Sequence, residues 1–162
     1  GKDPMVNIYS WVPQFIADLL PVGINRDNCR TPMQWNNQKN AGFSAAEKTW
    51  LPVNKDVEKR NVDLQLTDKD SLLNVFKKLL HLRKNSSALN SGKIEIVHTG
   101  NKNILAFIRS FEEEKLLVLI NFCNSKVTVN INLPVKGVVF SFQSKTSFED
   151  FLNGFDGVIL KI

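Results

Sequence analysis

Ten residues near the start of the chain, RDNCRTPMQW at positions 26–35, concentrate side chains that could do chemistry. They include two arginines, an aspartate, a cysteine, a glutamine and a tryptophan, and no helical or strand period explains the mixture. Arg30 offers a planar, permanently charged set of N–H donors that suits sugar hydroxyls, carboxylates or phosphates. From composition alone, a pairing of Arg30 with Asp27 that holds the loop together is the favoured interpretation.

Three aromatic residues follow at loop positions and could stack on a sugar ring: Trp35, Phe43 and Trp50. Aromatic side chains in loops more often fill the base of their own loop, so that role is expected here. Neither the arginine nor the rings identify a site by themselves.

The sequence contains little that resembles catalytic machinery. His81 and His98 have no histidine or cysteine at ligand spacing, and there is no glycine-rich phosphate loop or nucleophile-elbow motif. Asp68 and Asp70 stand where a helix cap is expected, and the acidic run 112–114 stands where a turn is expected. The expectation is therefore no metal, no cofactor and no catalytic residue in this chain.

The composition predicts a folded chain without a nucleic-acid or membrane partner. Of its 162 residues 43% are hydrophobic and 23% charged, and the lysines behind the net charge of +5 are scattered. No apolar run approaches the roughly 20 residues of a membrane span. Cys29 and Cys123 are expected to be free thiols, which favours a reducing, cytoplasmic setting over secretion without fixing the compartment.

The first third of the chain, up to about Thr67, is rich in proline and asparagine and predicts long loops, with one short helix over 11–20. A longer helix is predicted over 70–84, with Asp68 or Asp70 as its N-cap. Its apolar positions form one broad face that must be buried, and they are Leu72, Leu73, Val75, Phe76, Leu79, Leu80 and Leu82.

From Gly92 onward the pattern predicts six short strands, over 93–98, 104–109, 116–122, 127–133, 138–142 and 158–162. Residues 127–133 alternate strictly between apolar and polar, which indicates a strand with one wet face. The segment Glu112–Lys115 is expected to form a hairpin tip. The strands predict a small antiparallel sandwich that begins after a boundary near 85–92.

Five stretches together resemble the alpha-glucosidase and oligo-1,6-glucosidase branch of the alpha-amylase family. They are RDNCRTPMQW at 26–35, NAGFS at 40–44, TWLPVN at 49–54, NVDLQ at 61–65 and the helix end at Leu82–Lys84, and LVLINF at 117–122 resembles a strand of that family's C-terminal domain. The resemblance implies an α+β fragment: the last loop and helix of a (β/α)8 barrel over 1–88, then an antiparallel β-sandwich domain over 89–162.

The resemblance also implies a function. In such enzymes the guanidinium corresponding to Arg30 contacts the terminal glucose, which makes Arg30 the one expected substrate-binding residue. The catalytic aspartates and glutamate belong to barrel segments whose motifs are absent, so the chain is expected to be the C-terminal portion of a longer retaining enzyme that acts on short α-glucosides.

Three alternatives stay open. The chain could belong to a non-catalytic relative of the amino-acid-transporter heavy-chain type, which carries a similar loop. It could be a standalone sugar-binding module, which needs no catalytic residues. It could also be part of a trehalose synthase or trehalose-phosphate hydrolase, which shares the RTPMQW loop. No motif of this sequence points to a preference for α-1,4 or α-1,6 bonds or to an oligomeric state.

Overall fold

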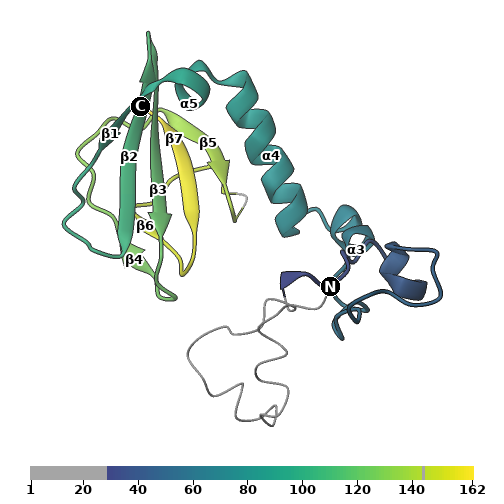
Figure 1. Cartoon of the computed structure of the whole chain (residues 1–162). Helices are drawn as coiled ribbons and strands as arrows, with labels where there is room; N and C mark the ends of the chain where they lie inside the picture. The colour runs from purple at the N-terminus through teal and green to yellow at the C-terminus, as the bar shows by residue number, and fades with distance from the viewer. Residues whose placement is uncertain (1–28, 144) are drawn as a thin grey trace, which may run out of the picture. The chain divides into compact units, whose positions relative to one another are not determined.

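The computed structural model describes residues 29–143 and 145–162 of the chain (Figure 1). The chain divides after Asn74 into two compact units, which are described separately below. The helix predicted over 11–20 and the proposed Arg30 partner Asp27 lie outside the described residues.

The first unit consists mostly of loops, as predicted, with two short helices among its described residues. The 3₁₀ helix η2 spans Lys39–Gly42 and the α-helix α3 spans Val62–Thr67. Helix α3 begins at Asn61, whose side-chain oxygen accepts a hydrogen bond from the backbone N–H of Leu64 at 2.9 Å. The sequence prediction missed α3, although an asparagine directly before a helical segment is an ordinary N-cap.

The predicted long helix is confirmed as α4, which spans Leu72–Asn85. Its predicted N-cap is wrong, because Ser71 Oγ accepts the hydrogen bond from the backbone N–H of Asn74 at 3.2 Å. Asp68 instead accepts a bond from the N–H of Asp70 at 2.9 Å and shapes the turn before the helix. Arg83 lies in the last turn, where a positive charge complements the helix dipole.

The apolar side chains of α4 lie on one broad face, as predicted, but only part of that face is buried. Leu79 and Leu82 pack with the cluster on the β-sheet. Leu72, Phe76 and Leu80, spaced four residues apart, are 78%, 57% and 50% exposed. The helix therefore packs part of its apolar face on the sheet that follows it, and the rest of that face is exposed.

A short helix, α5 (Ser87–Ser91), connects α4 to the sheet. Ser86 caps it by accepting a bond from the backbone N–H of Leu89 at 3.1 Å. Glu114 adds a second cap, because its carboxylate accepts bonds from Ala88 N–H at 2.8 Å and from Ser86 Oγ–H at 2.7 Å. These bonds fix α5 against the strand that begins at Glu114.

The second unit is built on a five-stranded antiparallel sheet with the strand order β1-β2-β3-β7-β5. A separate antiparallel pair, β4-β6, forms a second layer. The strands span Lys93–Ile96 (β1), Ile104–Phe111 (β2), Glu114–Asn121 (β3), Val127–Thr128 (β4), Gly137–Ser141 (β5), Phe151–Leu152 (β6) and Gly157–Lys161 (β7).

The β2–β3 hairpin turns at Glu112, which has a φ of 50°, so the predicted hairpin tip is confirmed. Residues 127–133 alternate as predicted, with Val127 and Val129 buried and Thr128 exposed. The strand itself is wrong in length, because its partner β6 supplies only two paired residues. Burial continues beyond the ladder since the alternating side chains still face the sheet.

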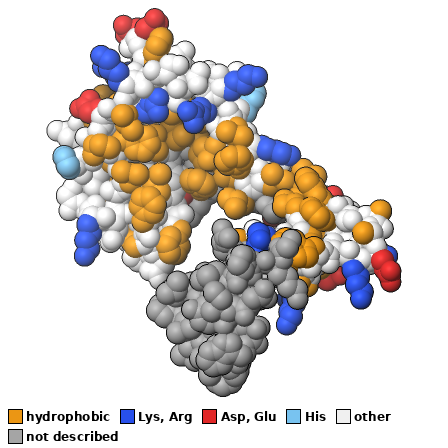
Figure 2. Space-filling model, in the orientation of Figure 1, with side chains coloured by type: hydrophobic (Ala, Val, Ile, Leu, Met, Phe, Trp, Pro, Cys, Tyr) orange, Lys and Arg blue, Asp and Glu red, His pale blue; other side chains and the backbone are white. Residues whose placement is uncertain are grey.

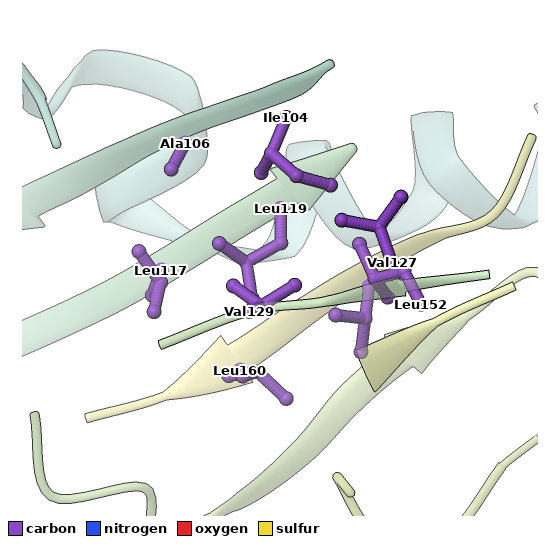
Figure 3. Packing of buried hydrophobic residues seen from close by; sticks show 9 residues of the cluster. Ile104, Ala106, Leu117, Leu119, Val127, Val129, Leu152 and Leu160 are labelled. Atoms are coloured by element: carbon purple, nitrogen blue, oxygen red, sulfur yellow. The ribbon is translucent and has the colours of Figure 1, made fainter. Parts of the chain in front are cut away.

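The main core lies between the five-stranded sheet and the second layer. Val127, Val129 and Leu152 pack toward Ile104 and other residues of the sheet (Figure 3). Leu117, Leu119 and Leu160 are completely buried there. Burial of each such leucine contributes about 2 kcal/mol before the entropy of folding is subtracted.

The opposite face of the sheet is only partly covered by α4 and α5, through the cluster that contains Leu116, Val118 and Ile159. Ile94 and Ile96 of the edge strand β1 are 61% and 56% exposed. They are paired across the ladder with Arg109 and Phe107, and Phe107 packs on that cluster. Hydrophobic side chains gather over this part of the molecule in Figure 2.

Candidate functional site

The loop that contains Arg30 is fixed at its far end to helix α3. The backbone N–H groups of Val62 and Asp63 donate to the carbonyls of Gln34 and Trp35 at 2.9 and 3.0 Å. The Gln34 side chain adds bonds from Nε2 to the Arg60 carbonyl at 2.5 Å and to Asp56 Oδ1 at 3.2 Å. Gln34 therefore shapes the loop.

A second loop, residues 36–46, folds against the first through a strained turn. Asn40, Ala41 and Gly42 have φ values of 52°, 57° and 66°. Left-handed backbone costs an alanine about 1 kcal/mol or more, so surrounding contacts must hold the turn in place. Trp35 N–H and Asn36 N–H both donate to the Ala41 carbonyl, at 2.9 and 3.2 Å, and provide those contacts.

The side chain of Asn40 continues the bracing. Its Nδ2 donates to the carbonyls of Ser44 and Ala46, at 3.1 and 2.7 Å. Ser44 Oγ in turn accepts a bond from the N–H of Ala46 at 3.1 Å. The segment that carries Phe43 is thus held from both sides.

Arg30 lies over the indole of Trp50, with its guanidinium carbon 5.2 Å from the ring centroid. This is a cation–π distance, and it joins residues 20 positions apart in the sequence. A pocket of about 210 Å³ opens beside the pair. Its wall consists of Arg30, Pro32, Phe43, Ser44, Lys48, Thr49, Trp50 and Leu51.

The three loop aromatics do not fill the base of their loop, which corrects the expectation from sequence. Trp35, Phe43 and Trp50 are 49%, 53% and 59% exposed. Phe43 and Trp50 line the Arg30 pocket, and Trp35 does not. The indoles of Trp50 and Trp35 are therefore similarly exposed, but only Trp50 lies in the Arg30 pocket.

A neighbouring pocket of about 310 Å³ lies on the other side of Pro32 and is more polar. It contains the ion pair of Asp56 with Arg60, whose Oδ2 and Nε are 3.6 Å apart. Gln34 Oε1 is buried without a hydrogen-bond partner in the described structure. Asp56 is the one carboxylate in the walls of these two pockets, so they hold no pair of carboxylates that could cleave a glycosidic bond.

Lys48, Ser44 and Thr49 were not singled out from the sequence, although they share the pocket with Arg30. The sequence signal for Ser44 and Thr49 was their place in the NAGFS and TWLPVN stretches, and Lys48, between the two stretches, had no such signal. Within the described residues no group of three or more histidine, cysteine or acidic side chains could hold a metal ion. Both cysteines are free thiols.

Comparison with known proteins places these loops in a family. Residues 12–92 match the model of the alpha-amylase catalytic domain, and residues 94–150 match the C-terminal domain of maltogenic amylase. The chain belongs to the alpha-amylase family. The first match contains both pockets and the second contains most of the sheet, so the α+β architecture of a barrel end followed by a C-terminal β domain is established.

Among curated relatives in this family, the oligo-1,6-glucosidase of Bacillus cereus is 42% identical over 97 residues, which is 60% of this chain and 17% of that protein. The trehalose-6-phosphate hydrolase of Bacillus subtilis is 34% identical over 107 residues, or 66% of this chain and 19% of that protein. These and similar curated relatives are much longer, and the chain spans only 17% to 25% of their length.

A solved structure confirms the fold across both units of this alpha-amylase family chain. Isomaltulose synthase from Klebsiella sp. LX3 superimposes with a TM-score of 0.77 and 26% sequence identity, over 96% of this chain and 30% of that one. Within the described residues, no helix is both long enough and apolar enough to cross a bilayer.

Proposed function

We propose that this chain is the C-terminal portion of a retaining α-glucosidase that hydrolyses short α-glucosides. The observation that carries the proposal is the pocket in which Arg30, Trp50 and Phe43 meet, on loops that match the alpha-amylase catalytic domain. The names of several relatives are those of α-glucosidases and oligo-1,6-glucosidases, which supports α-glucosides as the substrate class.

Arg30 is the proposed substrate-binding residue. Its guanidinium offers five N–H donors in a fixed plane, and one face of that plane lies against Trp50. The planar array of donors at the edge of the group has the geometry that suits vicinal hydroxyls of a glucosyl ring.

The chemical step in this proposal belongs to residues outside the chain. A retaining glycosidase uses two carboxyl groups about 5 Å apart, one as nucleophile and one as acid and then base. Attack gives a covalent glycosyl-enzyme, and water then releases the sugar with its anomeric configuration unchanged. The described pockets supply binding and orientation to that reaction, and supply no nucleophile.

We further propose a domain boundary between residues 88 and 89. Residues 1–88 would complete a (β/α)8 barrel, with α4 as its last helix, and residues 89–162 would form the sandwich that supports it. The exposed side chains of Leu72, Phe76 and Leu80 support this proposal, because they give α4 further apolar surface suited to packing on a barrel. Leu79 and Leu82 of the same broad face already pack on the sheet.

Steady-state kinetics of Arg30→Ala in the full-length protein that carries this chain test the proposal. With isomaltose and maltose as substrates, the loss of charge-assisted hydrogen bonds should lower kcat/KM by about 10- to 100-fold. Lys59→Ala is the matched control, because Lys59 is an exposed cation of the same unit that lines neither pocket. Unchanged kcat/KM in Arg30→Ala would remove Arg30 from the substrate site.

The same preparation separates the alternatives. Sugar binding without any hydrolysis would identify a non-catalytic member, of the transporter heavy-chain type or a sugar-binding module. Conversion or hydrolysis of trehalose or its 6-phosphate, in preference to maltose and isomaltose, would identify the trehalose-acting branch, which the similarity to a trehalose-6-phosphate hydrolase favours as the second candidate.

A further inference from the structure

Two aromatic rings in the Arg30 pocket are more than half exposed, although the loops that carry them are braced. Trp50 is 59% exposed and Phe43 is 53% exposed, and both face the same pocket of about 210 Å³. Leaving such large apolar surfaces in water forgoes the stabilisation that their burial would give. A ligand that covers the rings would recover it.

The backbone around the rings is prepared in advance of any ligand. Phe43 follows three residues in left-handed conformation, and the Asn40 side chain binds the carbonyls of Ser44 and Ala46. Thr49 Oγ1 donates to the Leu51 carbonyl at 2.6 Å and fixes the chain on both sides of Trp50. Strained backbone held by its surroundings is characteristic of binding sites.

Polar groups at the pocket match the hydroxyl groups of a sugar. Because Thr49 Oγ1 uses its proton on Leu51, it offers an acceptor, and because Ser44 Oγ already accepts a bond, it offers its proton. Arg30 and Lys48 add donors at the same wall. Aromatic rings beside a few placed donors and acceptors are the composition that binds a pyranose, whose C–H face is apolar and whose edge is polar.

We propose that Phe43 and Trp50 form an aromatic platform that holds one glucosyl ring of an α-glucoside, and that Trp50 also positions Arg30 beside that ring. The volume of about 210 Å³ lies below that of pockets for drug-sized ligands and fits a single sugar ring. The substrate class rests on the function proposed above. The assignment of Trp50, Phe43, Ser44, Lys48 and Thr49 to sugar contact goes beyond it.

A titration of the ¹⁵N-labelled chain with isomaltose, followed through the tryptophan indole N–H signals, tests the platform. The Trp50 signal should shift in a saturable way and the Trp35 signal should not. Trp50→Ala should weaken binding about tenfold, and Trp50→Phe should retain most of it, because a ring is kept. Trp35→Ala is the matched control for Trp50→Ala, since the Trp35 indole is 49% exposed and lies outside the pocket.

No saturable shift of Trp50 at any isomaltose concentration, or an equal effect of the Trp35 and Trp50 variants, would overturn the platform. Kinetics of the full-length protein distinguish a failure of the platform proposal from a failure of the proposed function. Hydrolysis that is sensitive to Arg30→Ala, with an unchanged KM in Trp50→Ala, would refute the platform alone. Sugar binding at Trp50 without hydrolysis would refute the glucosidase and leave the platform in place.

Discussion

Replacement of Asn121 by alanine should destabilise the β-sandwich strongly, because this buried side chain connects three segments of chain. Asn121 is 1% exposed at the end of β3. Its Nδ2 donates to the carbonyls of Ser125 and Asn153 at 2.8 and 2.7 Å, and its Oδ1 accepts from the N–H of Cys123 at 3.1 Å. At about 1 kcal/mol net for each bond, the loss is about 3 kcal/mol.

Urea unfolding of the chain, followed by circular dichroism, measures this loss. With an m-value of about 2 kcal/mol per molar urea, the midpoint should fall by about 1.5 M. Asn130→Ala is the matched control, since Asn130 is an exposed asparagine of the same unit, and it should change stability by less than about 0.5 kcal/mol. If Asn121→Ala unfolded within 0.5 kcal/mol of the parent chain, the three bonds would not stabilise the native state as described.

Two further predictions concern pKa values. The N–H of Ala88, followed by the hydroxyl of Ser86, lowers the pKa of Glu114. This carboxylate therefore stabilises the fold above its unfolded-state pKa and loses that contribution as pH falls through its lowered folded-state pKa. Urea midpoints of the parent chain and of Glu114→Gln should differ at pH 7 and converge in acid, and a difference that stays constant with pH would contradict this assignment. Hydrogen bonding with the Ser125 side chain, followed by the Ser125 backbone, lowers the pKa of the Cys123 thiol. Ser125→Ala should therefore slow alkylation of Cys123 by iodoacetamide at pH 7, measured by peptide mass spectrometry with Cys29 as internal reference. An unchanged rate would refute the assigned cause.

The sequence predicted the elements whose pattern is periodic. The α4 helix and the strands around Leu117 and Leu119 repeat apolar residues at helical or strand spacing, because each buries one face against a continuous surface. Strand β6 escaped prediction, since two residues carry no period. The unequal burial of the α4 apolar face also escaped it, because a helix sequence does not say how much of a face a neighbouring surface will cover.

The candidate site was predictable only in part. The RTPMQW stretch pointed to Arg30, but its contact with Trp50 joins two loops that have no periodic element between them. The pocket depends on left-handed backbone at Asn40 and Ala41, residues whose types do not require that conformation. The sequence likewise predicted Asn121 only as one more residue of a strand. Its buried side chain connects the carbonyls of Ser125 and Asn153, which come close only in the folded chain.

We propose that the Arg30 pocket is the substrate side of a retaining α-glucosidase whose catalytic carboxylates lie outside this chain. The most direct test is the anomeric configuration of the glucose released by the full-length protein from 4-nitrophenyl α-glucoside, whose leaving group contributes no glucose, followed by NMR in the parent and in Arg30→Ala. We expect α-glucose as the first product, with release slowed at least tenfold in the variant. First release of β-glucose, or equal rates in the two proteins, would contradict it.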